Sequence, residues 1–140
     1  PAAEKGPRRL REVKLLLDTH AFLWWIGDDA RLSGPAREAI ADPGNDVSFS
    51  VASAWELAIK TGIGRFEADG ELRPFLDEHI QRNAFRVLPV KLEHAVSVAS
   101  LPAHHRDPFD RLLVAQAAAE GLTLVTRDPQ LAKYGTPILW

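Results

Sequence analysis

Residues 14–26 read KLLLDTHAFLWWI, and this stretch decides the fold. Three consecutive leucines predict a buried strand, and Asp18-Thr19 directly after them is typical of a helix start. Residues 20–26 are apolar nearly all round, so the predicted helix needs cover on more than one side, from the core, a second subunit or another partner. A buried strand that leads straight into a helix favours an α/β fold.

Strands and helices alternate along the rest of the chain. We expect further strands at residues 46–51, 85–90, 122–125 and 138–140, and further helices at residues 33–38, 53–61, 72–80, 92–101, 107–120 and 129–134. Strands separated by helical segments imply a mostly parallel sheet between two layers of helices, a three-layer α/β/α sandwich. Ligands of open sheets of this kind bind beyond the carboxyl ends of the strands.

Length and composition indicate one compact domain. The chain has 140 residues, of which 46% are hydrophobic, and we assign residues 14–140 to the domain and the polar, basic residues 1–13 to a flexible lead-in. The absence of cysteine excludes disulfides, thiolate zinc sites and a cysteine nucleophile. No apolar stretch approaches the roughly 20 residues that span a bilayer, and no signal-peptide segment opens the sequence. We therefore expect a cytoplasmic protein without membrane contacts.

Four carboxylates occupy comparable places next to the predicted strands. Asp18 and Asp128 follow strand-like runs, whereas Glu56 and Asp110 lie on short helices beside such runs. The carboxyl ends of parallel strands meet at one edge of a sheet, so these acids are expected to converge there. Converging carboxylates are the usual means of holding a hard divalent cation against a phosphate.

Each acid also has a simpler interpretation when it is taken alone. Asp18, Asp107 and Asp128 all stand where a helix cap is expected, and the last two are each followed by proline. Glu56 is four residues before Lys60, the spacing of an ordinary ion pair on a helix. Capping and site membership are compatible, and the convergence of independent positions favours the site.

Net charge argues mildly against a nucleic-acid partner. The formal charge is −2 and the pI about 6.2, which lacks the basic footprint of most nucleic-acid binders. Setting aside the four carboxylates and Asp107 as a metal site leaves 14 acidic against 17 basic residues, a net charge of +3. The surface outside such a site is slightly cationic.

Histidines and tryptophans give weaker signals. His104-His105 lie in a loop before a helix, but without cysteine or a matching histidine pair a zinc site is disfavoured, and polar or cationic contacts to substrate are favoured. His20 is placed to orient a water, although a packed or capping role is favoured. Trp24 and Trp25 are expected in the core or in an interface rather than as platforms for bases.

Four segments together resemble a PIN-domain ribonuclease, specifically a VapC-type toxin of a bacterial toxin-antitoxin pair. The segments are LLLDTHAFLWW, SVASAWELAIKTGIGRF, HRDPFDRLLVAQA and LTLVTRDPQLAKYG. The resemblance runs from about residue 13 to residue 140, and the four segments occur in order and at suitable spacing.

The resemblance implies a site, a cofactor and partners. Its acidic site corresponds to Asp18, Glu56, Asp110 and Asp128, with Asp107 as an additional acid and with Thr19 and Thr126 as small hydroxyl residues beside it. It further implies Mg²⁺ or Mn²⁺, an RNA substrate, a homodimer and a small antitoxin protein that blocks the groove.

We therefore expect hydrolysis of RNA phosphodiester bonds to 5′-phosphate and 3′-hydroxyl ends, with inhibition of translation as the outcome. Asp18, Glu56 and Asp110 are expected to hold the principal metal, and Asp128 to support a second ion or a metal-bound water. Candidates for steering the RNA backbone, each of which also suits an ordinary surface salt bridge, are Lys60, Arg65, Arg106, Arg111 and Arg127.

Two other classes of function remain in view. The first is a non-catalytic module that binds RNA or protein and blocks translation by occlusion; an Asp18→Asn variant distinguishes it, because occlusion survives the loss of the carboxylate. The second is an aspartyl-nucleophile phosphatase, which typically has a second aspartate two residues after the first. His20 stands at that position, so this alternative is disfavoured.

Overall fold

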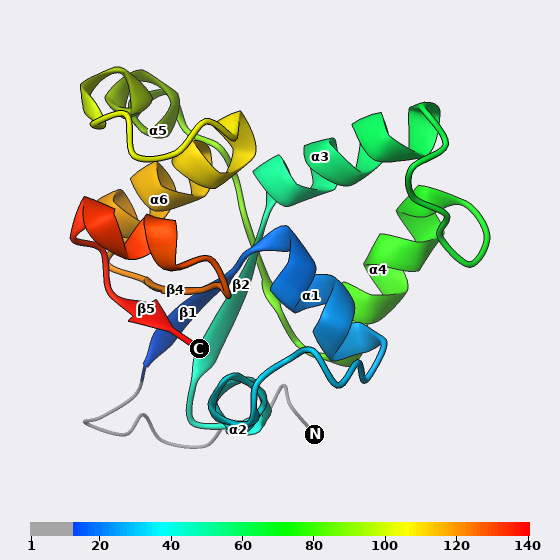
Figure 1. Ribbon diagram of the computed structural model, residues 1–140. Coiled ribbons are helices and arrows are strands. Elements are labelled where there is room, and N and C mark those ends of the chain that lie inside the picture. The colour runs from blue at the N-terminus through cyan, green and yellow to red at the C-terminus, as the bar shows by residue number, and fades with distance from the viewer. Residues whose placement is uncertain (1–12) are drawn as a thin grey trace.

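One five-stranded sheet forms the centre of the molecule (Figure 1). The computed structural model describes residues 13–140, so the expected lead-in lies, except for Val13, outside the described residues. The strands are β1 (Lys14–Leu17), β2 (Asp46–Ser50), β3 (Arg86–Leu88), β4 (Thr123–Val125) and β5 (Ile138–Leu139). Their order is β3-β2-β1-β4-β5, and all neighbours are parallel. The predicted α/β class is confirmed, and every pairing in this sheet is parallel.

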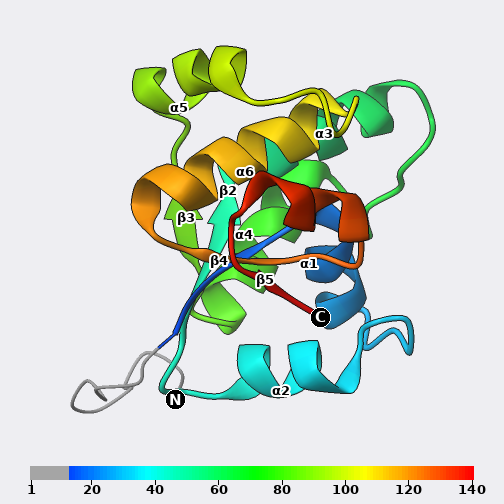
Figure 2. The ribbon, with the colours of Figure 1, turned by 60° about the vertical axis from the view of Figure 1, so that its left-hand side comes forward.

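Helices cover both faces of the sheet (Figures 1 and 2). One face carries α1 (Thr19–Ile26), α2 (Gly34–Ala41) and α4 (Leu72–Arg82), and the other carries α6 (Pro108–Glu120) with the 3-10 helix η2 (Pro129–Tyr134). The remaining helices are α3 (Val51–Gly62), which contributes to both apolar clusters, α5 (Leu92–Ser97) and the 3-10 helix η1 (Val98–Ser100). This is the predicted three-layer sandwich.

The three leucines of β1 explain why this strand is central. Leu15 and Leu17 point into the cluster beneath α1, α2 and α4, whereas Leu16 points into the cluster beneath α6. All three side chains are completely buried. Alternate residues of a strand face opposite sides, so only a strand covered on both faces accommodates such a run. Each buried leucine contributes about 1.5–3 kcal/mol relative to an exposed one.

Element boundaries differ from the prediction where polar side chains or proline decide them. Helix α3 begins at Val51, two residues early, because the Ser50 hydroxyl accepts the Ala52 N–H at 2.9 Å and caps the helix. Strand β3 is only three residues long, and Pro89, which has no N–H to donate, follows it. The helix expected at residues 92–101 divides into α5 and η1, and the segment 129–134 is 3-10 rather than α-helical.

Helix α1 is covered within the chain. Trp25 donates its indole N–H to Oδ1 of Asn83 at 3.0 Å, and the ring of Trp24 packs edge-on against Trp140, with the ring centroids 5.9 Å apart. No residue of α1 belongs to the exposed large hydrophobic side chains of the described region. A second subunit is therefore not needed to cover this helix. In residues 13–140, moreover, none of the helices combines the length and the hydropathy that crossing a membrane requires.

Candidate functional site

Five carboxylates from four separate segments line one pocket of about 450 Å³. Asp18 follows β1, Glu56 lies on α3, Asp107 and Asp110 lie at the start of α6, and Asp128 lies after β4. The parallel pairing of β1 with β4 brings two of these segments to the same edge of the sheet. The pocket therefore lies beyond the carboxyl ends of the strands, where a ligand of an open α/β sheet is expected.

Asp18 both caps a helix and faces the pocket. Its Oδ1 accepts the Ala21 N–H at 2.7 Å, and the hydroxyl of Thr126 also donates to the carboxylate. Only 8% of the residue is exposed. Burial, as the largest effect, raises the pKa of Asp18 above its usual value, and the two hydrogen bonds oppose this rise. The cap expected from the sequence is thus present, and the same carboxylate also lines the pocket.

Glu56 is buried and has two side-chain partners. The Thr19 hydroxyl donates to its Oε1 at 2.6 Å, and the Lys60 ammonium lies 2.7 Å from its Oε2. The Ser53 hydroxyl is 2.9 Å from that of Thr19 and holds it in place. The ordinary helix pair with Lys60 is therefore present, but Glu56 and Lys60 both line the pocket, so the pair belongs to the site.

The two acids of α6 differ in their surroundings. Asp107 caps the helix, because its Oδ1 accepts the N–H groups of Phe109 and Asp110 at 2.8 and 3.2 Å. Among residues 13–140, no group donates a hydrogen bond to the carboxylate of Asp110. Burial first, and then the negative charges of Asp107 and Asp18, raise the pKa of Asp110 to about 7. Within the described part of the chain no positive group lies within hydrogen-bond distance of this carboxylate, and the nearest ring nitrogen, Nε2 of His105, is 3.6 Å from its Oδ2. A bound cation would relieve the repulsion among these charges.

Asp128 is held by a residue that the sequence did not place beside it. Its Oδ1 accepts the Gln130 N–H at 2.9 Å, and its Oδ2 lies 2.7 Å from Nε2 of His105. The same His105 nitrogen lies 3.6 Å from Oδ2 of Asp110. From the sequence, His104-His105 were favoured for contacts to substrate. Only the place of His105, two residues before the cap of α6, could have indicated its position near the acids.

The donor set of the pocket fits a hard divalent cation. Carboxylate oxygens are the ligands that Mg²⁺ and similar ions prefer, and like charges packed together are stabilised by such an ion. One potential ligand atom from each of His105, Asp110 and Asp128 lies within 4.8 Å of the other two. The crowding of Asp18, Asp107 and Asp110, together with the raised pKa of Asp110, points to the same class of ion.

Comparison with known proteins identifies the family. The family model of the PIN domain matches residues 15–137, nearly the whole described region. The chain belongs to the PIN-domain family. This PIN domain is 30% identical over 127 residues to Ribonuclease VapC22 of Mycobacterium tuberculosis, a match that covers 88% of the chain and 93% of that protein. The resemblance to a VapC-type PIN domain seen in the sequence is confirmed.

Solved structures share the fold of this PIN domain. VapBC2 from Rickettsia felis, bound to a DNA fragment from its promoter, superposes with a TM-score of 0.66 at 16% identity, over 90% of this chain and 96% of that chain. DNA-bound VapBC from Salmonella typhimurium gives a TM-score of 0.66 at 19% identity, with the same coverage. PIN domains form a nuclease family in which divalent-metal dependence is general.

The basic residues proposed from the sequence separate into three groups in this PIN domain. Lys60 and Arg127 line the acidic pocket. Arg65 and Arg106 are exposed outside it. Arg111 instead donates to the Pro102 carbonyl at 2.9 Å and to the Tyr134 hydroxyl at 3.1 Å, and it also reaches carbonyl groups of η1 and its C-terminal cap. Its guanidinium is therefore engaged in holding the chain after α5 against η2.

Aromatic rings form one wall of the pocket. His20 and Trp24 both line it, and their rings stack with centroids 5.4 Å apart. The guanidinium of Arg127 lies 5.7 Å from the centre of the Trp24 ring. Trp24 is half-buried and packs within the chain, as the sequence favoured, but it also lines the pocket. His20 is exposed, so its outer face is accessible to a ligand.

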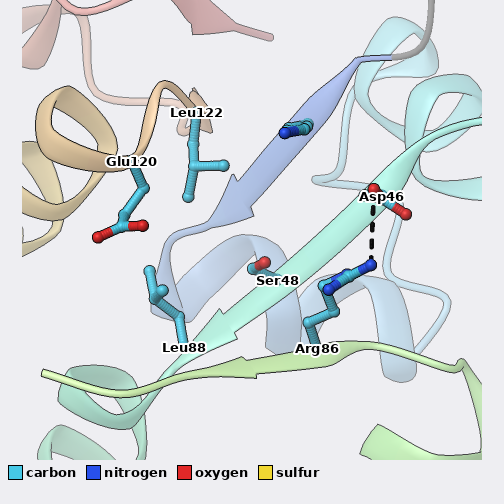
Figure 3. A pocket seen from close by; sticks show the side chains of 7 residues that line it. Asp46, Ser48, Arg86, Leu88, Glu120 and Leu122 are labelled. Atoms are coloured by element: carbon cyan, nitrogen blue, oxygen red, sulfur yellow. Dashed lines mark ion pairs between the residues drawn. The ribbon is translucent and has the colours of Figure 1, made fainter.

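A second hollow lies along β1, β2 and β3, between these strands and the segment that joins α6 to β4 (Figure 3). Its volume is about 210 Å³, and Lys14, Asp46 and Arg86, the first residues of β1, β2 and β3, lie in its wall. A loose ion pair joins Arg86 and Asp46 at 3.9 Å, as Figure 3 shows. Two basic and two acidic side chains offset one another there, so this hollow lacks the concentrated charge of the acidic pocket.

Proposed function

We propose that this chain is a divalent-metal-dependent endoribonuclease and the toxin of a toxin-antitoxin pair, acting on RNA in the cytoplasm. The observation that carries the proposal is the convergence of five carboxylates on one pocket, in which burial and the neighbouring acids raise the pKa of Asp110 to about 7. The 30% identity to a ribonuclease of the VapC group supports RNA as the substrate class. The products are 5′-phosphate and 3′-hydroxyl ends, and the consequence is inhibition of translation.

Each acid of the pocket has a role in this proposal. Asp18, Glu56 and Asp110 hold the principal ion, Mg²⁺ or Mn²⁺, and Asp128 supports a second ion or a water. Asp107 fixes the first turn of α6 and adds negative charge. When bound, the ion supplies an activated water and charge stabilisation at the phosphate. Water attacks phosphorus, the bond to the 3′ oxygen breaks, and that oxygen leaves with a proton as the 3′ hydroxyl.

Two small hydroxyl residues keep the carboxylates in place. Thr19 donates to Oε1 of Glu56, and Thr126 donates to Asp18. Lys60 neutralises the other oxygen of Glu56, which limits the repulsion among the acids. These contacts orient the carboxylates of Glu56 and Asp18 before the cation arrives, so little rearrangement of the two side chains is needed on binding.

Positive side chains at the rim suit the RNA backbone. Lys60 and Arg127 line the pocket, so we assign them to phosphates next to the scissile bond. Arg65 and Arg106 are assigned to phosphates further along the strand, because they are exposed outside the pocket. Arg111 is left out of this role because its guanidinium is engaged within the fold.

A second copy of the chain and a small antitoxin are the proposed protein partners. The solved neighbours from R. felis and S. typhimurium are VapBC assemblies, which supports a cognate antitoxin that covers the acidic pocket. Helix α3 exposes Val51, Trp55 and Ile59, and its C-terminal cap Ile63 is also exposed; these residues repeat every four positions and form one apolar stripe. We assign this stripe to the homodimer contact, in place of α1.

The experiment that tests the proposal compares RNA ends after brief expression of the wild-type chain and of Asp18→Asn. Wild type is expected to generate new 5′-phosphate ends, and Asp18→Asn to lose them. Asp77→Asn, which changes an exposed acid on α4 outside the pocket, is the matched control and should behave like wild type. If Asp18→Asn inhibits translation fully without generating ends, the non-catalytic occlusion module is the correct function.

A further inference from the structure

His105 connects the two loops that carry the outer acids of the pocket. Its Nδ1 accepts the backbone N–H of Asp107 at 3.0 Å, at the start of α6. Its Nε2 lies 2.7 Å from Oδ2 of Asp128, at the start of η2. The side chain is only 17% exposed, so both contacts are largely shielded from water. One imidazole therefore spans two segments that are 21 residues apart in the chain.

These two contacts fix the tautomer of the ring. A backbone N–H only donates, so Nδ1 of His105 must offer its lone pair to Asp107. In the neutral ring the proton then resides on Nε2, and Nε2 donates it to Asp128. Neither nitrogen has a lone pair left for a metal. His105 thus stands among potential ligands without being one, and a ligand role would require the ring to abandon Asp107.

The hydrogen bond from His105 completes the orientation of Asp128. Oδ1 of Asp128 is held by the Gln130 N–H, and Oδ2 is held by His105, so the carboxylate has a fixed plane. The Asp128 N–H donates to Oγ1 of Thr126, and the Thr126 hydroxyl donates to Asp18. A continuous chain of hydrogen bonds therefore runs from the start of α6 through Asp128 to the acid that follows β1.

We propose that His105 is a positioning residue that sets the orientation of the Asp128 carboxylate toward the metal pocket through its Nε2–H. The inference rests on the proposed function, since it assumes that the pocket holds a divalent cation. A partner that orients a metal-site residue typically changes metal affinity or activity by about 10- to 100-fold when it is removed. We expect a loss of that size in kcat, with a smaller change in KM, because His105 makes no assigned contact with RNA.

Two substitutions separate the contacts of the ring. His105→Gln retains a donor near the position of Nε2, and so its reach to Asp128, but loses the acceptor for Asp107. His105→Asn retains an acceptor near the position of Nδ1 but does not reach Asp128. We expect activity to decrease in the order wild type, His105→Gln, His105→Asn, with His105→Ala equal to His105→Asn. His104→Ala is the matched control: His104 is exposed, packs against Tyr134 and lies outside the pocket.

Binding of Mn²⁺, followed by electron paramagnetic resonance, supplies a readout that does not depend on RNA cleavage. His105→Asn and His105→Ala are expected to weaken Mn²⁺ binding by about 10-fold or more, and His105→Gln less. In an Asp128→Asn background, His105→Ala should cause no further loss, because the carboxylate it orients is already gone.

The outcomes are distinct for the inference and for the proposed function. If His105→Asn retains more activity and Mn²⁺ binding than His105→Gln, the residue only supports the loop before α6, and the inference is overturned. Variants that bind Mn²⁺ and cleave RNA like wild type also overturn it. Wild-type protein that binds Mn²⁺ without cleaving RNA contradicts the proposed function, while the Mn²⁺ series still decides the role of His105.

Discussion

The ammonium group of Lys60 lies 2.7 Å from Oε2 of Glu56 inside the acidic pocket. Only 8% of the Glu56 side chain is exposed, against 35% for Lys60, so the lysine provides charge compensation to a carboxylate that water scarcely reaches. Because Lys60 is one helical turn after Glu56, the compensation is built into α3 itself. The pocket therefore carries its own compensating cation for Glu56, and Arg127 is a second basic side chain in its lining.

Removal of this cation should destabilise the metal-free protein. Lys60→Met keeps the aliphatic length but leaves the Glu56 charge poorly compensated, and we expect a loss of about 1–3 kcal/mol in the free energy of unfolding by urea. Saturating Mg²⁺ should recover much of that loss. Lys133→Met, at an exposed position of η2, is the control and should change stability by less than about 0.5 kcal/mol. Equal effects of the two variants would contradict this role.

Stability of the metal-free protein should depend on pH through Asp110. Its pKa is about 7 in the folded state against 3.8 for the free side chain, so the folded state binds the proton more tightly than the unfolded state does. The proton-linked stabilisation is complete below about pH 4 and is lost as the pH rises to about 7. For this group we expect a decrease of roughly 2–4 kcal/mol across that range.

Asp110→Asn removes this titration and is the variant that isolates it. Thermal unfolding of the metal-free protein between pH 5 and pH 8 should show a smaller decrease in stability for Asp110→Asn than for wild type. Asp77→Asn, which alters an exposed carboxylate, should leave the slope of wild type unchanged. An identical pH dependence in wild type and Asp110→Asn would show that this carboxyl does not titrate near pH 7.

The Thr19 hydroxyl should be required for the orientation of Glu56. Thr19→Val is nearly isosteric but lacks the hydrogen bond to Oε1 at 2.6 Å, and burial of an acceptor without its partner costs about 1–3 kcal/mol. We expect lower thermal stability together with weaker Mg²⁺ binding, measured by calorimetry. Thr61→Val is the control, because that hydroxyl donates to the Leu57 carbonyl on an exposed part of the same helix. A Thr19→Val protein with unchanged affinity would remove Thr19 from the site.

Arg127 and Arg111 should have opposite effects. Arg127→Gln is expected to weaken RNA binding and to reduce by about 1 the slope of log K against log salt, with little change in thermal stability. Arg111→Gln is expected to lower the midpoint of thermal unfolding, because four hydrogen bonds to the loop after α5 and to Tyr134 are lost, with the salt slope unchanged. RNA binding is measured with both arginine variants made in the Asp18→Asn background, so that cleavage does not interfere with the measurement of affinity. A loss of thermal stability in Arg127→Gln and a smaller salt slope in Arg111→Gln would contradict these assignments.

The sequence was informative about the fold because its signals are local. Three leucines before Asp18 identify a strand buried on both faces, and Asp107-Pro108 identifies the start of α6. Parallel pairing then follows from the alternation of strands and helices, and with it the edge of the sheet at which the acids meet. The positions of acids that directly follow a strand or begin a helix could therefore be predicted from the sequence.

Contacts between distant segments were not accessible in the same way. The hydrogen bond of His105 to Asp128 joins two loops, and no periodicity encodes it. Arg111 stands among the residues of the site in sequence, yet its side chain turns toward Pro102 and Tyr134. The cover of α1 comes from Asn83 and from Trp140, at the end of the chain. Each of these depends on side-chain direction in three dimensions.

The most direct measurement of the central claim is an anomalous difference map of a crystal equilibrated with Mn²⁺. The account predicts a peak in the acidic pocket, surrounded by the carboxylates of Asp18, Glu56 and Asp110, and loss of that peak in Asp18→Asn. No peak at saturating Mn²⁺, or a peak elsewhere, such as beside His94 and Glu120, would contradict the claim that these acids share a divalent cation.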